Sequence, residues 1–247
     1  MAELELEALA EKYKAGQVLL INKPLTWTSF DVVNKIRYSL KKYLGIKKIK
    51  VGHAGTLDPL ATGLVIVCTG KATKEIDQYL GQQKRYVASV RLGATTPTLD
   101  METEPDQEFP WKHVTTQRLE EVVQSFKGEI EQVPPVFSAL KVNGRKAYEM
   151  ARKGQEVKMQ PRQVTIHDMH VLESDLPDFK VDVTCSKGTY IRSLARDLGT
   201  ALESGAFLTG LIRTEIGDFD LGMAQSIEMF EKKLKEIATN EQSLRIR

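Results

Sequence analysis

The sequence from Gly52 to Cys68, GHAGTLDPLATGLVIVC, joins a glycine-rich turn to an apolar strand and places one carboxylate, that of Asp58, in the turn. Its glycines permit positive φ or close approach of the backbone to a ligand. Pro59 fixes φ at the residue after the acid. The segment therefore predicts a stiff turn that aims Asp58. Taken alone, an Asp before Pro is more often a turn former or a helix cap than a catalyst, so other parts of the chain must decide its function.

The apolar half of this stretch predicts a central strand. Residues 64–68 are apolar without interruption, which is typical of a strand buried on both faces. Residues 85–92 instead alternate, with Tyr86 on the apolar face, as in a half-buried strand. Further strands are predicted at 18–21, 164–172 and 179–185. With the helices between them, these strands predict one α/β body, of α+β type, over residues 16–221.

Helices are predicted where apolar residues recur at a spacing of three and four. Thr28 begins one helix, with Asp31 at the capping-box position. Its buried stripe is Val33, Ile36 and Leu40. The other predicted helices lie at 1–15, at 119–126 before Gly128, after Gly144, after Thr189, and at 223–247. The helix after Gly144 is expected to carry Arg145, Lys146, Arg152 and Lys153, and a loop-rich stretch precedes it at 133–144.

Composition narrows the class of protein. The chain has 247 residues, 41% of them hydrophobic, and no apolar run approaches the roughly 18 residues that cross a bilayer. We therefore expect a soluble, cytoplasmic protein with no membrane partner. Cys68 and Cys185 lie in apolar strand-like runs, which suits buried thiols. The four histidines lack the paired spacing of a metal site, so no metal is predicted.

Charge is unevenly distributed, although the net charge is only +2. Residues 35–50 contain seven basic side chains and no acidic one. This basic stripe indicates either a solvated helix face or a surface for nucleic-acid phosphates. Residues 100–108 carry five acidic side chains around Pro105 and are expected to form a solvated loop.

Several motifs, in order along some 190 residues, resemble those of the bacterial tRNA pseudouridine synthase B (TruB) family. The segment 52–63, with Lys71-Ala72-Thr73-Lys74 after it, is similar to the catalytic motif of that family. The other matching segments are Asn22-Lys23-Pro24, Lys84-Arg85-Tyr86, residues 134–141 (PPVFSALK), residues 185–192 (CSKGTYIR) and Leu211-Ile212-Arg213. Their order and spacing make the resemblance highly specific.

The resemblance implies the pseudouridine synthase fold, a mixed and largely antiparallel central sheet flanked by helices and RNA-binding loops. It also implies conversion of uridine 55 in the T arm of tRNA to pseudouridine, without a metal or organic cofactor. The implied partner is the T stem-loop of tRNA, with no guide RNA or protein partner, and the implied state is a monomer. Isomerisation breaks the N1 glycosidic bond, turns the uracil and joins C5 to the ribose, so a carboxylate is needed beside a flipped nucleotide.

Asp58 matches the essential aspartate of the family. Attack on the base, attack on the ribose and abstraction of a ribose proton all remain open as its role. Arg192 matches the arginine that pairs with this aspartate and would keep it ionised in a partly dry site.

Five further positions are implied to contact the substrate. Tyr86 matches the aromatic residue that stacks on the target base, although its alternation also suits core packing. His53 matches a residue that contacts the extruded nucleotide or fills the space it leaves. Tyr190 and Leu211 match pocket-lining residues, with ordinary core positions as the alternative. Lys23 is expected to support the active-site loop or a phosphate.

Basic residues outside the pocket are expected to hold the RNA backbone by charge and shape. These residues are Lys41, Lys42, Lys47, Lys48, Arg145, Lys146 and Arg152. The segment 133–154 corresponds to a mobile RNA-gripping loop of the family.

Two departures from the family pattern stand out. Ala54 replaces a frequent threonine, which we expect to be tolerated. Only 34 residues follow Arg213, too few for the C-terminal RNA-binding (PUA) module of many members. We therefore predict a catalytic domain over 1–222 and a helical extension, without that module, over 223–247. How RNA is then gripped stays open.

Three other functions fit the sequence less well. A non-catalytic RNA-binding or RNA-folding protein would not need Asp58 together with Arg192. A guide-RNA-dependent enzyme acting on ribosomal RNA would be expected to use the missing terminal module. An enzyme that cradles nucleotide phosphates would need a Gly-Lys-Ser/Thr ending or a dinucleotide glycine spacing, and neither occurs.

Overall fold

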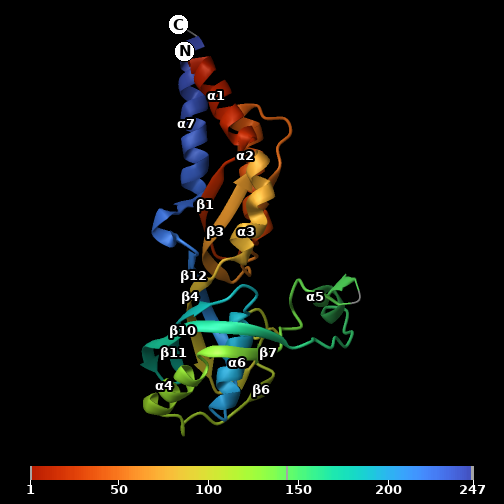
Figure 1. Cartoon of the computed structure of the whole chain (residues 1–247), viewed down its shortest axis with the longest axis vertical. Coiled ribbons are helices and arrows are strands. Elements are labelled where there is room, and N and C mark those ends of the chain that lie inside the picture. The colour runs from red at the N-terminus through yellow and green to blue at the C-terminus, as the bar shows by residue number, and fades with distance from the viewer. Residues whose placement is uncertain (1, 143, 246–247) are drawn as a thin grey trace. The chain divides into compact units, whose positions relative to one another are not determined.

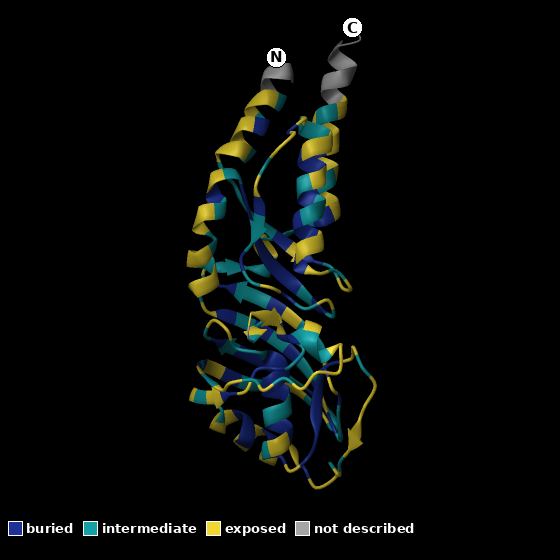
Figure 2. Cartoon of the chain, turned by 90° about the vertical axis from the view of Figure 1, so that its right-hand side faces the viewer, coloured by how far each residue is buried: buried dark blue, intermediate teal, exposed yellow. Residues whose placement is uncertain are grey.

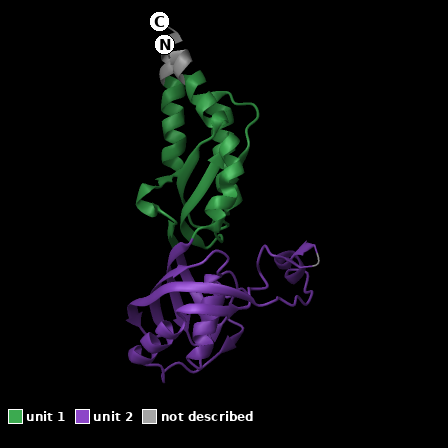
Figure 3. Ribbon diagram, viewed as in Figure 1, with its two compact units in different colours: residues 1–82, 212–247 green, residues 83–211 purple. Residues whose placement is uncertain are grey.

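The computed structural model describes residues 2–142 and 144–245, and the chain forms two compact units (Figure 3). Unit 1 comprises residues 1–82 and 212–247, and unit 2 comprises residues 83–211. The chain returns from unit 2 to unit 1 within one strand, β12 (Ala206–Ile216). The assignment of residues 1–222 to one catalytic domain stays a prediction.

Unit 1 combines an antiparallel sheet with long helices (Figure 1). Its helical elements are α1 (Ala2–Ala15), α2 (Ser29–Leu44), the 3-10 helix η1 (Gly70–Glu75), α3 (Ile76–Gly81), η2 (Leu221–Met223) and α7 (Ile227–Arg245). Its strands are β1 (Val18–Lys23), β2 (Val51–His53), β3 (Ala61–Thr69), the second half of β12, β13 (Phe219–Asp220) and β14 (Gln225–Ser226).

Strand β3 is the centre of this sheet, as its apolar run predicts. It pairs antiparallel with β1, from Val18 opposite Cys68 to Lys23 opposite Gly63. At the C-terminal end of β3, Val67 to Thr69 also pair with β2. Leu64 to Cys68 are all fully buried. The strand order continues from β3 to β12 on one side and from β1 to the parallel strand β14 on the other. A strand covered on both faces needs an apolar centre, and residues 64–68 supply it.

The helices of unit 1 bury the stripes that the sequence predicts. Thr28 caps α2 in a reciprocal capping box with Asp31, and Val33, Ile36 and Leu40 are buried. In α7, Phe230 and Leu234 are buried, and Phe230 meets the ring of Tyr13 from α1 edge-on at 6.3 Å. Figure 2 shows the buried strands beneath helices whose outer faces are exposed. The predicted terminal helix begins only at Ile227, because residues 225–226 join the sheet instead.

Unit 2 is built on a second set of antiparallel strands. Its strands are β4 (Lys84–Leu92), β5 (Ala94–Thr95), β6 (Gln107–Glu108), β7 (Gly128–Gln132), β8 (Lys141–Val142), β9 (Arg145–Lys146), β10 (Arg162–Asp175), β11 (Asp178–Cys185) and the first half of β12. Its helices are α4 (Thr116–Ser125), α5 (Ala147–Ala151) and α6 (Ile191–Ala201).

The sheet of unit 2 runs in the order β12, β4, β11, β10, β7. Strand β4 buries Tyr86 and every second residue to Leu92, as its alternation predicts. Helix α6 buries Ile191, Leu194 and Leu198. The predicted mixed, largely antiparallel sheet of an α/β protein is thus confirmed.

Two sequence expectations for unit 2 are wrong. Arg145 and Lys146 lie in the short strand β9, which pairs with β8, and not in a helix. A two-strand hairpin satisfies the backbone there, and the helix that follows has five residues. Asp100 is buried, unlike the four other acidic residues of the run 100–108, because it lies beside the buried Arg192. Asn143, near the end of the predicted loop-rich stretch 133–144, lies outside the described residues.

Within the residues that the structure describes, no helix combines the length and the apolar character that a membrane span requires.

Gly63 lies where two strands of unit 1 approach too closely for a side chain. Its φ is +107°, and a Cβ at this position would collide with the backbone carbonyl of Arg213 on the neighbouring strand. We expect Gly63→Ala to lower the free energy of unfolding by about 3 kcal/mol or more, measured by urea denaturation.

Gly45→Ala is the matched control, since Gly45 also has positive φ, +63°, but an added Cβ there meets nothing within 4 Å. Its expected cost is about 1 kcal/mol, from backbone strain alone. Equal losses in the two variants would contradict the steric argument.

Candidate active site

The turn that carries Asp58 is held by backbone hydrogen bonds from three sides. The amide of Ala61 donates to the carbonyl of Asp58 at 3.0 Å, and the amide of Thr26 donates to the carbonyl of Pro59 at 2.8 Å. Ser29, at the start of α2, accepts a hydrogen bond from the Leu57 amide at 2.8 Å through its buried hydroxyl. Asp58 itself is half-buried. The stiff turn that the sequence predicts is therefore confirmed.

Lys23 braces the same turn from β1. Its side chain is fully buried, and its Nζ donates to the carbonyls of Pro24, Trp27 and Pro59 at 3.0, 2.6 and 3.4 Å. These three acceptors match the three N–H donors of an ammonium group. Burial lowers the pKa of Lys23 to about 8, although the nearby Asp58 carboxylate acts in the opposite direction. Lys23 thus braces the Asp58 turn, and its predicted part in an active site stays a prediction.

Arg213, on β12, is a second buried cation at this turn. It is 1% exposed. Its Nε donates to the carbonyl of Leu64 at 2.7 Å, and its two terminal nitrogens donate to the carbonyls of Thr56 and Gly55 at 3.4 and 3.2 Å. In the sequence, Arg213 stands out only as part of a motif and has no predicted role. The signal that could have found it is a lone arginine that follows the mostly apolar stretch 206–212.

His53 ends β2, just before the turn. The ring is half-buried, and its Nδ1 is buried with no hydrogen-bond partner among the described residues. Burial, followed by the charge of Arg213, lowers the pKa of His53, while a backbone contact with Gly55 raises it. A neutral imidazole can both donate and accept a hydrogen bond.

In unit 2, Arg192 lies at the start of α6 and is 5% exposed. Its terminal nitrogens donate to the carbonyls of Thr98 and Phe137 at 2.8 and 2.9 Å, and its Nε lies 3.7 Å from an oxygen of Asp100. Arg192 therefore ties the 96–100 loop to the segment 133–154. Its predicted pairing with Asp58, a residue of unit 1, stays a prediction.

The predicted pocket residues of unit 2 occupy neighbouring elements. Tyr86 is 9% exposed and lies opposite Val183 in the β4–β11 pair. Leu211, on β12, is half-buried. The Tyr190 backbone exchanges two hydrogen bonds with the side chain of Gln132, and the guanidinium of Arg162 lies over its ring at 4.7 Å. The substrate roles of these three residues stay predictions.

The predicted RNA-backbone residues are all exposed. In unit 1 they lie in the last turn of α2 and in the loop after it. Two other residues of the basic stripe bind groups of the protein itself. Lys35 forms an ion pair with Glu231, and Arg37 donates to the Asn34 side chain and to the Val51 carbonyl. In unit 2, Arg145 and Lys146 lie on the hairpin that Figure 1 shows projecting with α5. Arg152, beside them, forms an ion pair with Glu102 at 2.8 Å.

Groups of three or more His, Cys, Asp or Glu side chains that could hold a metal ion are not found within residues 2–142 and 144–245. Cys68 and Cys185 are buried free thiols, as predicted.

Comparison with known proteins gives a consistent match. Residues 41–191 match the family model described as TruB family pseudouridylate synthase (N terminal domain). The chain is 56% identical over 224 residues to tRNA pseudouridine synthase B of Phocaeicola vulgatus, covering 91% of this chain and 95% of that protein. It is 52% identical to tRNA pseudouridine synthase B of Flavobacterium johnsoniae, covering 91% of this chain and 99% of that one.

Among solved structures, the chain is similar to one in the crystal structure of a Cbf5-Nop10-Gar1 complex. The identity is 30% and the TM-score 0.68, with 90% of this chain covered. The chain spans only 56% of that solved chain.

The three donors of Lys23 generate a pH prediction. Above its pKa of about 8 the neutral amine keeps two N–H donors for three carbonyls, so the turn loosens and a positive charge near Asp58 disappears. We expect kcat/KM for any reaction at Asp58 to fall as pH rises through about 8. Below that pH Lys23 is charged and the rate does not depend on its titration.

Lys23→Met separates this effect from other titrations. The variant lacks the charge at every pH, so its kcat/KM should be lower throughout and should not show the fall near pH 8. Melting temperatures measured across the same pH range control for unfolding. A fall near pH 8 that persists unchanged in Lys23→Met would assign the titration to another group.

Proposed function

Because the chain belongs to the TruB family of pseudouridylate synthases, we propose that it isomerises uridine 55 in the T arm of tRNA to pseudouridine, with Asp58 as the catalytic carboxylate. Pseudouridine synthases are isomerases, and the relatives over 50% identical to this chain are named tRNA pseudouridine synthase B. The observation that carries the assignment of Asp58 is its turn, in which two buried cations, Lys23 and Arg213, bind the backbone carbonyls around one half-buried carboxylate.

The reaction conserves the atoms of the base and ribose apart from one exchanged proton. The bond from N1 to the ribose carbon breaks, the uracil turns, C5 bonds to the same ribose carbon, and the hydrogen on C5 leaves while N1 is protonated. Attack on the base, attack on the ribose and abstraction of a ribose proton each place the carboxylate beside the glycosidic bond. A rigid turn suits all three routes, because misplacement by about 1 Å can cost a hundredfold in rate.

The remaining substrate roles divide by physical type. Tyr86 offers a flat ring for stacking on the flipped base, and His53 offers a half-buried imidazole on the strand beside the Asp58 turn. The pocket-lining roles of Tyr190 and Leu211, and the pairing of Arg192 with Asp58, are the roles that the family resemblance implies. The exposed Lys41, Lys42, Lys47, Lys48, Arg145, Lys146 and Arg152 bind backbone phosphates.

We further propose that the enzyme acts on tRNA as a cytoplasmic monomer, without a guide RNA. An alternative in which the protein works within a larger complex has support in the likeness to a chain of the Cbf5-Nop10-Gar1 complex, at 30% identity over 56% of that chain. The relatives named for tRNA are 56% identical and are covered over 95% of their length, which favours direct action on tRNA.

Release of tritium from RNA carrying 5-tritiated uridine tests the reaction, because C5 must give up its hydrogen when it joins the ribose. We expect the wild type to release tritium from a T-arm stem-loop and from full-length tRNA without added metal. We expect Asp58→Asn to abolish release while its RNA affinity stays within a few fold, because the carboxylate serves chemistry more than affinity.

Asp77→Asn is the matched control, since Asp77 is an exposed acid on α3 of the same unit. It should keep wild-type activity. Equal loss of binding and turnover in Asp58→Asn would count against a catalytic role. Binding without release by the wild type, on both RNAs, would indicate the non-catalytic RNA-binding alternative.

Tyr86 is tested by paired substitutions. Tyr86→Phe keeps the aromatic face and should retain kcat/KM within a few fold. Tyr86→Leu keeps an apolar side chain but removes stacking worth about 1–3 kcal/mol, so kcat/KM should fall roughly 10- to 100-fold. Comparable activity of the two variants, at matched melting temperature, would assign Tyr86 to core packing alone.

A further inference from the structure

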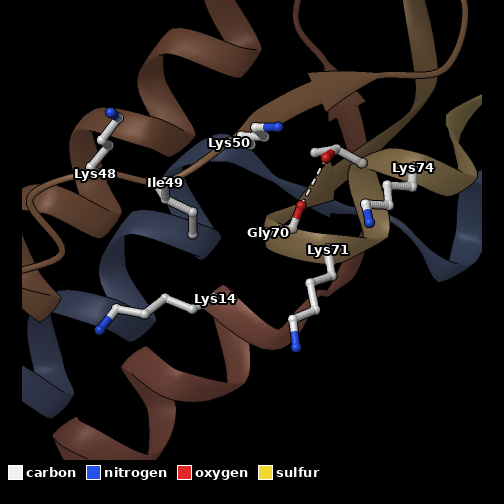
Figure 4. Close-up of a pocket in the computed structure, with 8 residues that line it drawn as sticks. Lys14, Lys48, Ile49, Lys50, Gly70, Lys71 and Lys74 are labelled. Carbon is white, nitrogen blue, oxygen red and sulfur yellow. Dashed lines mark hydrogen bonds between the residues drawn. The ribbon is translucent and has the colours of Figure 1, made fainter.

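Five lysines surround a pocket in unit 1, and only one of them, Lys48, is among the residues assigned above to the RNA backbone. Its lining comes from the end of α1, the loop before β2, and η1, and comprises Lys14, Lys48, Ile49, Lys50, Gly70, Lys71, Thr73 and Lys74. The cavity volume is about 270 Å³. Figure 4 shows the lysines arranged around Ile49 and Gly70. We call this site the lysine pocket.

The backbone beneath the lysine pocket is locked. The Gly70 amide donates to the carbonyl of Lys50 at 2.9 Å, and the Thr69 hydroxyl donates to the carbonyl of Tyr13 in α1 at 2.9 Å. A Cβ on Gly70 would collide with the carbonyl of Lys14, so only glycine allows α1 this close. The Thr73 hydroxyl closes η1 by donating to the Gly70 carbonyl at 2.8 Å. Three segments distant in sequence thus hold the lysines together without a ligand.

The charge of the lysine pocket is almost uncompensated. Lys14 pairs with Glu11 at 2.7 Å, but the other four lysines make no ion pair in the part of the chain that the structure describes. Glu75, at the end of η1, accepts a hydrogen bond from Gln78 instead. Other lysines of this protein do find carboxylates, as Lys35 does with Glu231 and Lys127 with Asp168. Neighbouring like charges destabilise a fold modestly, so this cluster contributes no stability of its own.

The lysine pocket is remote from the proposed catalytic carboxylate. It adjoins the Thr69 end of β3, whereas Asp58 precedes the Ala61 end. At about 3.3 Å per residue, the nine residues of β3 separate the two by roughly 25 Å. A group bound in the pocket therefore cannot be the nucleotide that reacts at Asp58.

We propose that the lysine pocket binds phosphates of the tRNA backbone at a distance of roughly 25 Å from the reacting uridine. The proposal rests on the proposed function for the identity of the RNA. An RNA helix is a regular polyanion, and four exposed, unpaired ammonium groups complement it. Lysine binds phosphate as a point charge, without reading sequence, so the pocket supplies affinity and register.

The test compares two variants with the same reduction in charge. The pocket variant replaces four lysines together by Gln, namely Lys48, Lys50, Lys71 and Lys74. The control variant makes the same change at four other exposed lysines of unit 1, namely Lys12, Lys232, Lys233 and Lys235. Binding of full-length tRNA is measured by filter retention over a series of salt concentrations. We expect the pocket variant to bind about tenfold or more weakly near 0.1 M salt. We also expect its salt slope to fall by about 0.7–0.9 for each phosphate that the variant no longer binds. The control should stay within about twofold.

A second RNA separates a remote contact from local damage. A T-arm hairpin too short to extend 25 Å from its loop should be modified at the wild-type rate by the double variant Lys71→Gln with Lys74→Gln, which keeps Lys48. The double variant Lys71→Gln with Lys74→Gln, which changes only exposed side chains of η1, should show about half of the change in slope on full-length tRNA.

Three results would overturn the proposal. They are equal loss of affinity in the control, an unchanged salt slope in the pocket variant, and equal loss of turnover on the short hairpin. Binding can be measured without turnover, so the phosphate site and the proposed reaction can be disproved independently. If the wild type forms no pseudouridine but the pocket variant alone loses tRNA affinity, the proposed reaction is wrong and the phosphate site stands.

Discussion

The arrangement of unit 1 depends on the burial of two cations beside one turn. A buried ammonium or guanidinium group is tolerated only when its N–H groups are hydrogen-bonded, since an unpaired buried charge costs several kcal/mol. Lys23 and Arg213 find these acceptors in backbone carbonyls at residues 24, 27, 55, 56, 59 and 64. The requirement works in both directions. The cations need those carbonyls, and the carbonyls are fixed by the cations, so the loop around Asp58 is confined from β1 and β12 at once.

In unit 2 a buried cation also binds backbone carbonyls, but there it joins two loops to a helix. Arg192 binds the carbonyls of Thr98 and Phe137 and lies beside the buried Asp100, so two long loops are attached to the start of α6. Loops without regular structure otherwise open easily, because few buried contacts hold them. The exposed ion pair of Arg152 with Glu102 adds a second polar attachment beyond Phe137. The part of unit 2 implied to grip RNA is thus attached by polar contacts more than by a core.

Local patterns predict the elements of the fold and fail where long-range contacts decide. Strand β3, the capping box at Thr28 and the buried face of α6 follow from neighbouring residues, whose spacing alone fixes which side is apolar. Arg213 lies 149 residues along the chain from Leu64, whose carbonyl it binds, and the residues next to it in the sequence do not predict that contact. The solvated loop predicted at Asp100 fails for the same reason, since its partner is Arg192. Of the candidate site, the position of Asp58 on a rigid turn is predictable from the sequence, whereas the groups that make the turn rigid mostly are not.

The cations of unit 1 that the proposals use fall into a buried group and an exposed group, and salt affects the two groups differently. Lys23 and Arg213 are hidden from salt and bind backbone carbonyls, so ionic strength hardly screens their effect on the Asp58 turn. The lysines around Gly70 are exposed, and attraction from them is screened within about 8 Å at physiological ionic strength. Increasing salt should therefore weaken RNA affinity long before it disturbs the geometry at Asp58. Under the proposed function, buried cations keep the catalytic geometry and exposed ones supply the affinity, so surface substitution can change RNA affinity without altering the chemistry.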